Sequence, residues 1–250
     1  ALAVMEIAKQ KNRVTMPSAG LSTAILGEKC SPLNAQWTTN TYALAAGTAR
    51  ALVQEGKKTW YFITADYTFG HSLEKDATEV IKENGGTVVG VSRHPFPGND
   101  FSSFLLKAQA SKADVIALAN AGNDTVNAVK QANEFGINKK QIVAPLLTYI
   151  SDVHSMGLSK AQGMYLTEAF YWDYDDASRA WAKKFFEKAK KMPTASQAGV
   201  YSATLSYLKA IEAAGTDDAP AVMAKLREMT INDAVIRNGK LRADGALVHD

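Results

Sequence analysis

The sequence predicts an α/β protein built around a parallel sheet. Short apolar runs that favour strands alternate with amphipathic runs that favour helices, and right-handed βαβ crossovers join such strands in parallel. The clearest unit covers residues 59–90, where the bulky run 60–63 precedes a helical pattern and a second strand begins at Thr87. Ligands of open parallel sheets sit beyond the carboxyl ends of the strands, which directs attention to the loop 65–69.

The elements before this unit alternate less regularly. The sequence predicts, in order, a helix at 1–10, a strand at 13–16, a tight loop at 17–20, an irregular segment at 22–37 and a helix at 42–54. The first helix lacks a capping residue and is expected to begin upstream. Thr39 or Asn40 can cap the helix at 42–54, and Gly56 ends it.

The alternation continues to residue 169 and then changes. Helices are expected at 101–110, 126–135 and 151–158, and strands at 114–119, 141–144 and 163–167. After an aromatic and acidic stretch at 170–176, the pattern predicts long helices at 177–190, 197–214 and 219–229, and small strands or a hairpin at 236–250.

Composition excludes several classes. The 250 residues suffice for one or two domains, and 46% apolar with 21% charged residues is ordinary for a soluble globular protein. A net charge of +3 is too small to indicate nucleic acid or a membrane surface. No apolar run reaches the ~18 residues of a spanning helix, and residues 1–10 do not form a signal peptide, which a mature chain would have lost. The single cysteine, Cys30, excludes an internal disulfide and a cysteine zinc site, and we expect a buried or half-exposed thiol.

Catalytic templates are absent from the sequence. It has no Gly-x-Ser-x-Gly elbow, no phosphate-cradling glycine loop, and no GxGxxG after a strand. The four histidines, which we expect at the surface or at helix caps, are His71, His94, His154 and His249. The acidic pairs 175–176 and 217–218 could serve acid–base chemistry or a metal, but acids before a helix are more often first-turn residues. We therefore predict no catalytic residue, no metal and no cofactor.

Loops at strand ends instead carry small, hydroxyl, amide and aromatic side chains. In a parallel sheet they would converge, with backbone N–H groups and hydroxyls holding a carboxylate and Phe69, Tyr171 or Trp172 walling an apolar tail. Any single aromatic among them could equally be core packing. The predicted ligand-binding set is Ser18, Ala19, Gly20, Tyr67, Phe69, Ala121, Gly122, Asn123, Thr148, Tyr149 and Tyr171.

Long motifs resemble the type I periplasmic solute-binding proteins of ABC transporters, over essentially the whole chain. They are TADYTFGHSLEKD at 64–76, the stretch 101–137, FYWDYDDASRAWAKKFF at 170–186 and AGVYSATLSYLKAIEAAG at 198–215. The branch it resembles most is usually assigned to branched-chain amino acids. Within that branch, ADYTFGH, LANAG and FYWD resemble members that bind aromatic carboxylates such as benzoates, coumarates and phenylpropanoids.

The resemblance implies two Rossmann-like lobes with parallel sheets, joined by a hinge, with the ligand between them. Lobe I would comprise 1–39 and 170–250, and lobe II 40–169. Family members begin about two βαβ turns before Ala1 and continue past Asp250, so this chain is expected to lack part of lobe I, including a serine or threonine carboxylate clamp. That absence leaves open an upstream partner for Cys30. The resemblance also implies a periplasmic location reached through a signal peptide not present here.

Residues carried over from the resemblance suggest the ligand's chemistry. Ser18, Ala19 and Gly20 would meet a ligand carboxylate, and Phe69 stands where amino-acid binders place a tyrosine. Gly122 or Asn123 stands near a second such tyrosine. Amino-acid binders carry an acid just after a proline to hold the ammonium. Here Pro145 is followed by Leu146, so a buried ammonium would lack its partner.

The sequence therefore predicts an extracytoplasmic receptor of an ABC importer, not an enzyme, that binds a small aromatic carboxylate. The carboxylate would be held at residues 18–20, and the ring walled by Tyr67, Phe69, Tyr149 and Tyr171. An inner-membrane permease is the expected partner, and no nucleic acid is. The alternatives are a branched-chain or aromatic amino acid-binding protein and a ligand-sensing domain on the same fold. The ring substituents, the oligomeric state and the open or closed form stay open.

Overall fold

The computed structural model describes residues 1–249 and divides the chain into two compact units. Unit 1 consists of Ala1–Asn40 and Ala169–Asp250, and unit 2 is Thr41–Glu168. The expected lobe boundaries lie one residue away from these at each junction. Within residues 1–249, no helix combines the length and apolarity needed to cross a bilayer.

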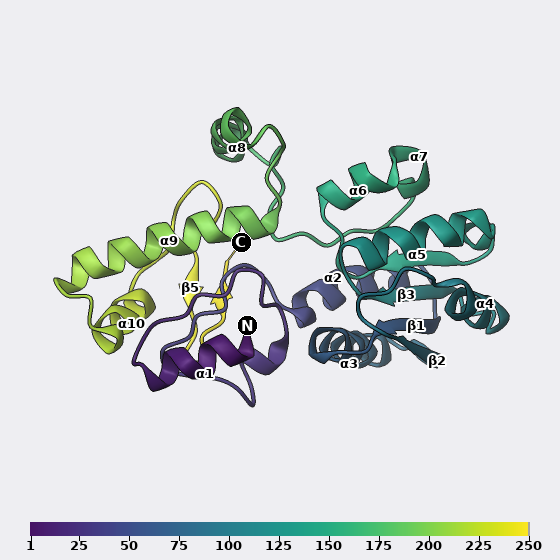
Figure 1. Ribbon diagram of the computed structural model, residues 1–250, viewed down its shortest axis with the longest axis horizontal. Coiled ribbons are helices and arrows are strands. Elements are labelled where there is room, and N and C mark those ends of the chain that lie inside the picture. The colour runs from purple at the N-terminus through teal and green to yellow at the C-terminus, as the bar shows by residue number, and fades with distance from the viewer. Residues whose placement is uncertain (250) are drawn as a thin grey trace. The chain divides into compact units, whose positions relative to one another are not determined.

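Unit 2 contains a four-stranded parallel sheet, which confirms the predicted α/β class (Figure 1). Its strands, in spatial order, are β2 (Thr87–His94), β1 (Thr59–Ala65), β3 (Val115–Ala119) and β4 (Ile142–Pro145). Ala65 pairs with His94, and Thr64 pairs with Ala119, so these strands end at one edge. The chain runs from β2 across β1 to β3, which places the topological switch point between β1 and β3.

Helices cover both faces of this sheet. The helices of unit 2 are α2 (Thr41–Gln54), α3 (Thr68–Glu83), α4 (Ser102–Ala110), α5 (Asn123–Glu134), α6 (Ile150–Met156) and α7 (Leu158–Ala161), with the 3-10 turn η2 (Ile137–Lys139). Tyr61 and Ile63 of β1 share a buried cluster with apolar residues of α4 and α5. Because side chains alternate along a strand, the buried Trp60 and Phe62 face the opposite side. There α3 packs on the sheet and α2 packs on α3.

A buried hydrogen bond joins α2 to α3. The Thr41 hydroxyl at the start of α2 donates to the Asp76 carboxylate of α3 over 2.5 Å, and both side chains are buried. The first turn of α2 is thereby fixed to the helix that follows β1.

The strand predicted at 163–167 is wrong. This segment is irregular and is fastened to α2 through its side chains. Thr167 lies against Gly47, where a Cβ atom would come within 2.4 Å of its hydroxyl oxygen, and Thr167 also hydrogen-bonds Thr48 over 2.9 Å. The Tyr165 hydroxyl donates to Glu55 over 2.6 Å. These contacts hold the segment along α2 rather than in strand pairing beside β4.

The part of unit 1 that follows residue 169 is mostly helical, as predicted. Its elements are α1 (Leu2–Gln10), the 3-10 turn η1 (Thr23–Ile25), α8 (Asp176–Ala189), α9 (Ala195–Ala214), α10 (Ala219–Glu228), β5 (Lys240–Leu241) and β6 (Leu247–Val248). The antiparallel pair β5–β6 confirms the small strands predicted near the end. The predicted strand at 13–16 reduces to a single parallel bridge between Thr15 and Asn34.

The predictions for two acidic residues and for Cys30 have different outcomes. Asp175 and Asp218 cap α8 and α10 by accepting from the backbone N–H groups of Ser178 and Ala221, at 2.8 and 3.2 Å. That confirms their interpretation as helix-start acids. The expectation for Cys30 is wrong, because its residue is exposed on the turn-rich segment after η1.

Candidate functional site

The carboxyl edge of the unit 2 sheet carries seven of the predicted site residues. There β1, β3 and β4 lead into α3, α5 and α6, whose N-terminal capping residues are Tyr67, Gly122 and Tyr149. The strands β1 and β3, which flank the switch point, thus each lead into a helix amino end at this edge. Helix amino ends present N–H groups and favour negative charge, so this edge suits an anionic ligand.

The loop after β3 is built on a glycine. Gly122 has φ 60° and ψ −131°, a conformation that is essentially restricted to glycine. It allows α5 to begin at Asn123, three residues before the predicted start at Val126. Asn123 is exposed on the first turn, while Ala121 and Gly122 are partly exposed. A peptide backbone free of bulky side chains thus faces the edge.

Three aromatic rings gather at the ends of β1 and β2. The ring centroids of Tyr67 and Phe69 are 5.9 Å apart, and those of Tyr67 and Phe96 are 4.5 Å apart with planes only 20° from parallel. Burial, and next the charge of Asp124, raise the pKa of the Tyr67 phenol, so it is a neutral donor at pH 7. Phe96 was not predicted from the sequence, because the pattern indicates where the second strand begins but not where it ends. The prolines on either side of Phe96, Pro95 and Pro97, were the available signal.

A buried polar network lies beneath these rings, and it corrects the surface placement expected for His94. That side chain is 1% exposed at the end of β2, and its ring nitrogen Nε2 lies 3.3 Å from the Asn120 amide. Asn120 in turn accepts from Thr125 over 2.7 Å. Asp124, also buried, lies 3.7 Å from His94 Nδ1. Buried polar groups at the carboxyl ends of β2 and β3, the strands on either side of β1, thus lie within contact of one another.

The loop after β4 holds a buried hydroxyl without a partner. Thr148 is 2% exposed, and its Oγ1 has no hydrogen-bond partner among the described residues. An unsatisfied buried hydroxyl costs about 1–3 kcal/mol, so such a group is a candidate for a ligand contact. Beside it, the Tyr149 N–H donates to Asp152 over 2.9 Å. Burial, and next the charge of Asp152, raise the pKa of Glu168 to about 8.

The remaining predicted residues belong to unit 1. Ser18 is buried and its carbonyl accepts from the Thr38 hydroxyl over 2.8 Å, while the Gly20 carbonyl accepts from Gln36 over 2.8 Å. Ala19 between them is exposed. Tyr171 is 49% exposed and its ring lies 5.8 Å from that of Trp172. Residues 18–20 thus form one fixed turn, and their meeting with the unit 2 set stays a prediction.

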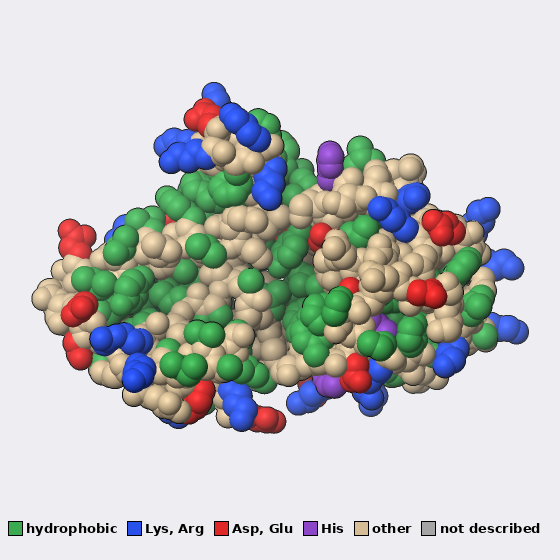
Figure 2. All heavy atoms as spheres, viewed as in Figure 1, with side chains coloured by type: hydrophobic (Ala, Val, Ile, Leu, Met, Phe, Trp, Pro, Cys, Tyr) green, Lys and Arg blue, Asp and Glu red, His purple; other side chains and the backbone are tan. Residues whose placement is uncertain are grey.

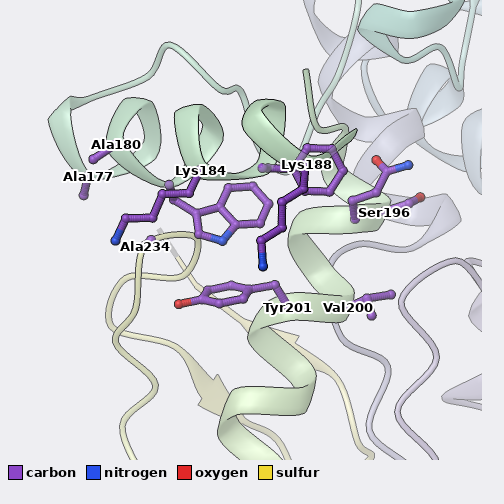
Figure 3. A pocket seen from close by; sticks show the side chains of 11 residues that line it. Ala177, Ala180, Lys184, Lys188, Ser196, Val200, Tyr201 and Ala234 are labelled. Carbon is purple, nitrogen blue, oxygen red and sulfur yellow. The ribbon is translucent and has the colours of Figure 1, made fainter. Parts of the chain in front are cut away.

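Unit 1 also contains an apolar groove of about 930 Å³ between α8, α9 and the loop at Ala234 (Figure 3). Trp181, Tyr201 and Phe185 line it together with two lysines of α8. The ring of Trp181 lies 5.2 Å from that of Tyr201 and 5.7 Å from that of Phe185. In Figure 2 basic side chains gather on α8 and hydrophobic ones on the neighbouring part of unit 1. None of the predicted site residues lines this groove.

A smaller hollow of about 270 Å³ lies between residues 14–18 and α9. Ser18 is the predicted residue that lines it, opposite Val200, Ala203 and Tyr207. Ser18 itself is buried, and its role in holding a carboxylate stays a prediction.

Comparison with known proteins agrees with the fold. The sequence profile of the periplasmic binding protein family matches residues 1–250. A periplasmic binding protein from Burkholderia mallei is 48% identical with a TM-score of 0.97, over 99% of this chain and 66% of that one. A branched-chain amino acid ABC transporter ligand-binding protein from Burkholderia xenovorans LB400 is 38% identical with a TM-score of 0.87, over 99% of this chain and 67% of that one.

A curated protein is also similar to this chain in sequence. Leu/Ile/Val-binding protein homolog 6 of Brucella melitensis biotype 1 is 29% identical over 236 residues, which are 90% of this chain and 59% of the relative. The chain therefore spans about three fifths of that relative's length. It belongs to the periplasmic binding protein family.

Proposed function

We propose that this chain is part of an extracytoplasmic receptor that delivers a small aromatic carboxylate to an ABC permease. The observation that carries this proposal is the cluster of rings at the carboxyl edge of the parallel sheet, beside the switch point where such sheets bind ligands. Flat apolar walls beside helix amino ends suit a ring that bears a carboxylate.

Binding would use residues of both units. The turn at 18–20 would hold the carboxylate, and the rings of Tyr67, Phe69, Tyr149 and Tyr171 would surround the aromatic group. The backbone of 121–123 and the unpaired hydroxyl of Thr148 would complete the polar contacts. Closure of two lobes about a hinge would then trap the ligand without breaking any bond.

The residues of the loop after β4 favour a ligand that has no ammonium group. Leu146 and Leu147, both buried, follow Pro145 where an acid would be needed. The loop leads into α6. Asp152 in the first turn of α6 accepts a hydrogen bond from the Tyr149 N–H, and the next acid along the chain is Glu168. Since the pKa of Glu168 is raised to about 8, its carboxyl is mostly protonated at pH 7 and pairs poorly with a cation.

Known relatives support both kinds of ligand. Proteins similar to this chain carry names that refer to branched-chain amino acids, which keeps amino acid binding as the second candidate. A Rhodopseudomonas palustris solute-binding protein with the same fold, 20% identical at a TM-score of 0.89, was solved in complex with 4-hydroxybenzoate. At that identity the likeness concerns the fold, which is thus compatible with an aromatic carboxylate.

A thermal-shift panel on the native protein tests the proposal. Ligand that binds only the folded state raises the melting temperature by mass action. We expect benzoate, 4-hydroxybenzoate or cinnamate to raise it, with leucine, valine and phenylalanine at equal concentration giving no shift. A shift with the amino acids alone would establish the second candidate.

A transport assay separates import from sensing. We expect that deleting the gene abolishes uptake of the radiolabelled ligand and that the intact gene restores it. Unchanged uptake in the deletion strain would favour a ligand-sensing domain.

A further inference from the structure

We propose that Phe96 contacts the ligand and sets its preferred length, an inference that rests on the aromatic carboxylate function above. Phe96 follows β2 and belongs to none of the loops that the sequence indicated. Its position, its packing and its exposure each support this role, and together they distinguish it from an ordinary surface phenylalanine.

Strand register places Phe96 beside Tyr67. Ala65 and His94 are the last paired residues of β1 and β2, and the Asp66 N–H extends the ladder by donating to the His94 carbonyl over 2.8 Å. Tyr67 and Phe96 each lie two residues beyond that pair. Their rings consequently stack, at 4.5 Å between centroids and 20° between planes.

The loop that carries Phe96 is held in place by two side chains of α5. The Gly98 N–H lies 3.2 Å from both carboxylate oxygens of Asp124, which is 2% exposed. The Gln131 amide donates to the Asn99 carbonyl over 2.9 Å. Because α5 carries both Asp124 and Gln131, the same helix that begins at the switch point fixes this loop.

The ring of Phe96 is 52% exposed even though the Tyr67 ring stacks against it. Single exposed hydrophobic residues are common and need no explanation. Phe96, however, is oriented by a stacked ring and by an anchored loop, so little conformational freedom would be lost on binding. A ring held in this way is a preorganised wall for a second aromatic group.

Distance from the switch point gives the length preference. β2 neighbours β1 on the side away from β3, so Phe96 lies about one strand spacing, ~4.8 Å, farther from the switch point than Tyr67 does. A ligand that binds at the switch point therefore needs a longer body to reach Phe96 than to reach Tyr67. Cinnamate-type acids are longer than benzoates by a two-carbon spacer between ring and carboxylate.

Calorimetric titration of the native protein and of Phe96→Leu with cinnamate and with benzoate tests this inference. Leucine keeps an apolar side chain but removes the flat face, so we expect about tenfold weaker cinnamate binding and less than about threefold weaker benzoate binding. Phe96→Tyr keeps the ring and should bind both within twofold. Phe135→Leu is the matched control, since that phenylalanine is exposed elsewhere in unit 2, and it should change neither affinity.

The outcomes separate the two proposals. Cinnamate affinity unchanged in Phe96→Leu, with wild-type binding intact, would remove Phe96 from the site and leave the aromatic carboxylate function standing. An equal loss for both ligands would overturn the length preference. Failure of the wild-type protein to bind any aromatic carboxylate, with amino acids bound instead, would overturn the function itself and this inference with it.

Discussion

Gly70 of α3 lies so close to Ala65 of β1 that a Cβ atom on the glycine would come within 2.1 Å of the alanine's carbonyl oxygen. The same atom would be 3.1 Å from the carbonyl oxygen of Ala119 in β3. The first turn of α3 therefore rests directly on the ends of both strands that flank the switch point. This contact positions the loop that carries Tyr67 and Phe69.

Gly70→Ala is expected to destabilise unit 2 by about 1–3 kcal/mol, because the backbone atoms that it meets cannot rotate away as a side chain can. It should also weaken ligand binding by displacing the aromatic loop. Urea unfolding and calorimetry measure the two effects. Gly27→Ala is the control, since a Cβ there would meet nothing closer than 3.7 Å. Equal stability of the two variants would contradict the close packing.

Asp114, just before β3, is hydrogen-bonded to the start of β1 at the opposite, amino end of the sheet. Its carboxylate accepts from the backbone N–H groups of Lys58 and Thr59, both at 2.9 Å, and from the Thr59 hydroxyl at 2.8 Å. The hydrogen bonds from Thr59 lower the pKa of Asp114. A carboxyl whose folded-state pKa is lowered stabilises the fold above its unfolded-state pKa and loses that contribution as the pH falls.

Asp114→Asn should therefore cost about 1–2 kcal/mol of unfolding free energy at pH 7, and the difference from wild type should narrow as the pH drops below about 4. Chemical unfolding across this pH range checks it, with the exposed Asp217→Asn as the control. If the difference in unfolding free energy between Asp114→Asn and wild type did not vary with pH, the charge of Asp114 would not contribute to its hydrogen bonds.

The contribution of Glu168 to stability depends on pH in the opposite direction. Burial and Asp152 raise its pKa from 4.5 to about 8, so its contribution to stability is fully present below pH 4.5 and is lost as the pH rises through 8. Glu168→Gln should leave stability nearly unchanged at pH 4 and raise it by about 1–3 kcal/mol at pH 9. Thermal melts at the two pH values measure this, with the exposed Glu83→Gln as the control. A Glu168 variant less stable than wild type at pH 9 would exclude a raised pKa.

The apolar groove of unit 1 is expected to be a packing surface rather than the ligand site. Trp181→Ala should lower the stability of unit 1 by about 1–3 kcal/mol, because the Trp181 ring packs 5.4 Å from Phe170 and 5.2 Å from Tyr201. It should leave the affinity for an aromatic carboxylate within twofold, and so should Lys188→Ala. A tenfold loss of affinity in both variants, measured by calorimetry, would move the site into this groove.

Local pattern predicted the parallel sheet and its helices well. The run 60–63 is bulky and β-favouring, and Leu73, Ala77, Val80 and Ile81 recur at helical spacing, so β1 and α3 are found where expected. The acids Asp175 and Asp218 identified helix starts because capping is a local interaction. The site loops followed from the sheet, since they come directly after its strands.

Features that depend on distant contacts were not predictable. Residues 163–167 have strand-like composition, but Thr167 fits beside Gly47 and Thr48 of α2, more than a hundred positions earlier. His94 at the end of β2 is buried beside Asn120 and Asp124, which follow β3, two strands away in the sheet. The stacking of Phe96 on Tyr67 depends on the register of β1 and β2, which the sequence pattern does not reveal. Tertiary pairing, which no local pattern encodes, decided each of these cases.

A crystal structure of the native protein with its tightest-binding aromatic carboxylate tests the central claim most directly. The account predicts ligand density at the carboxyl ends of β1 and β3, with the ring in contact with Tyr67 or Phe69 and the carboxylate at residues 18–20. A ligand bound against Trp181 and Tyr201 in the unit 1 groove, or anywhere away from that sheet edge, would contradict it.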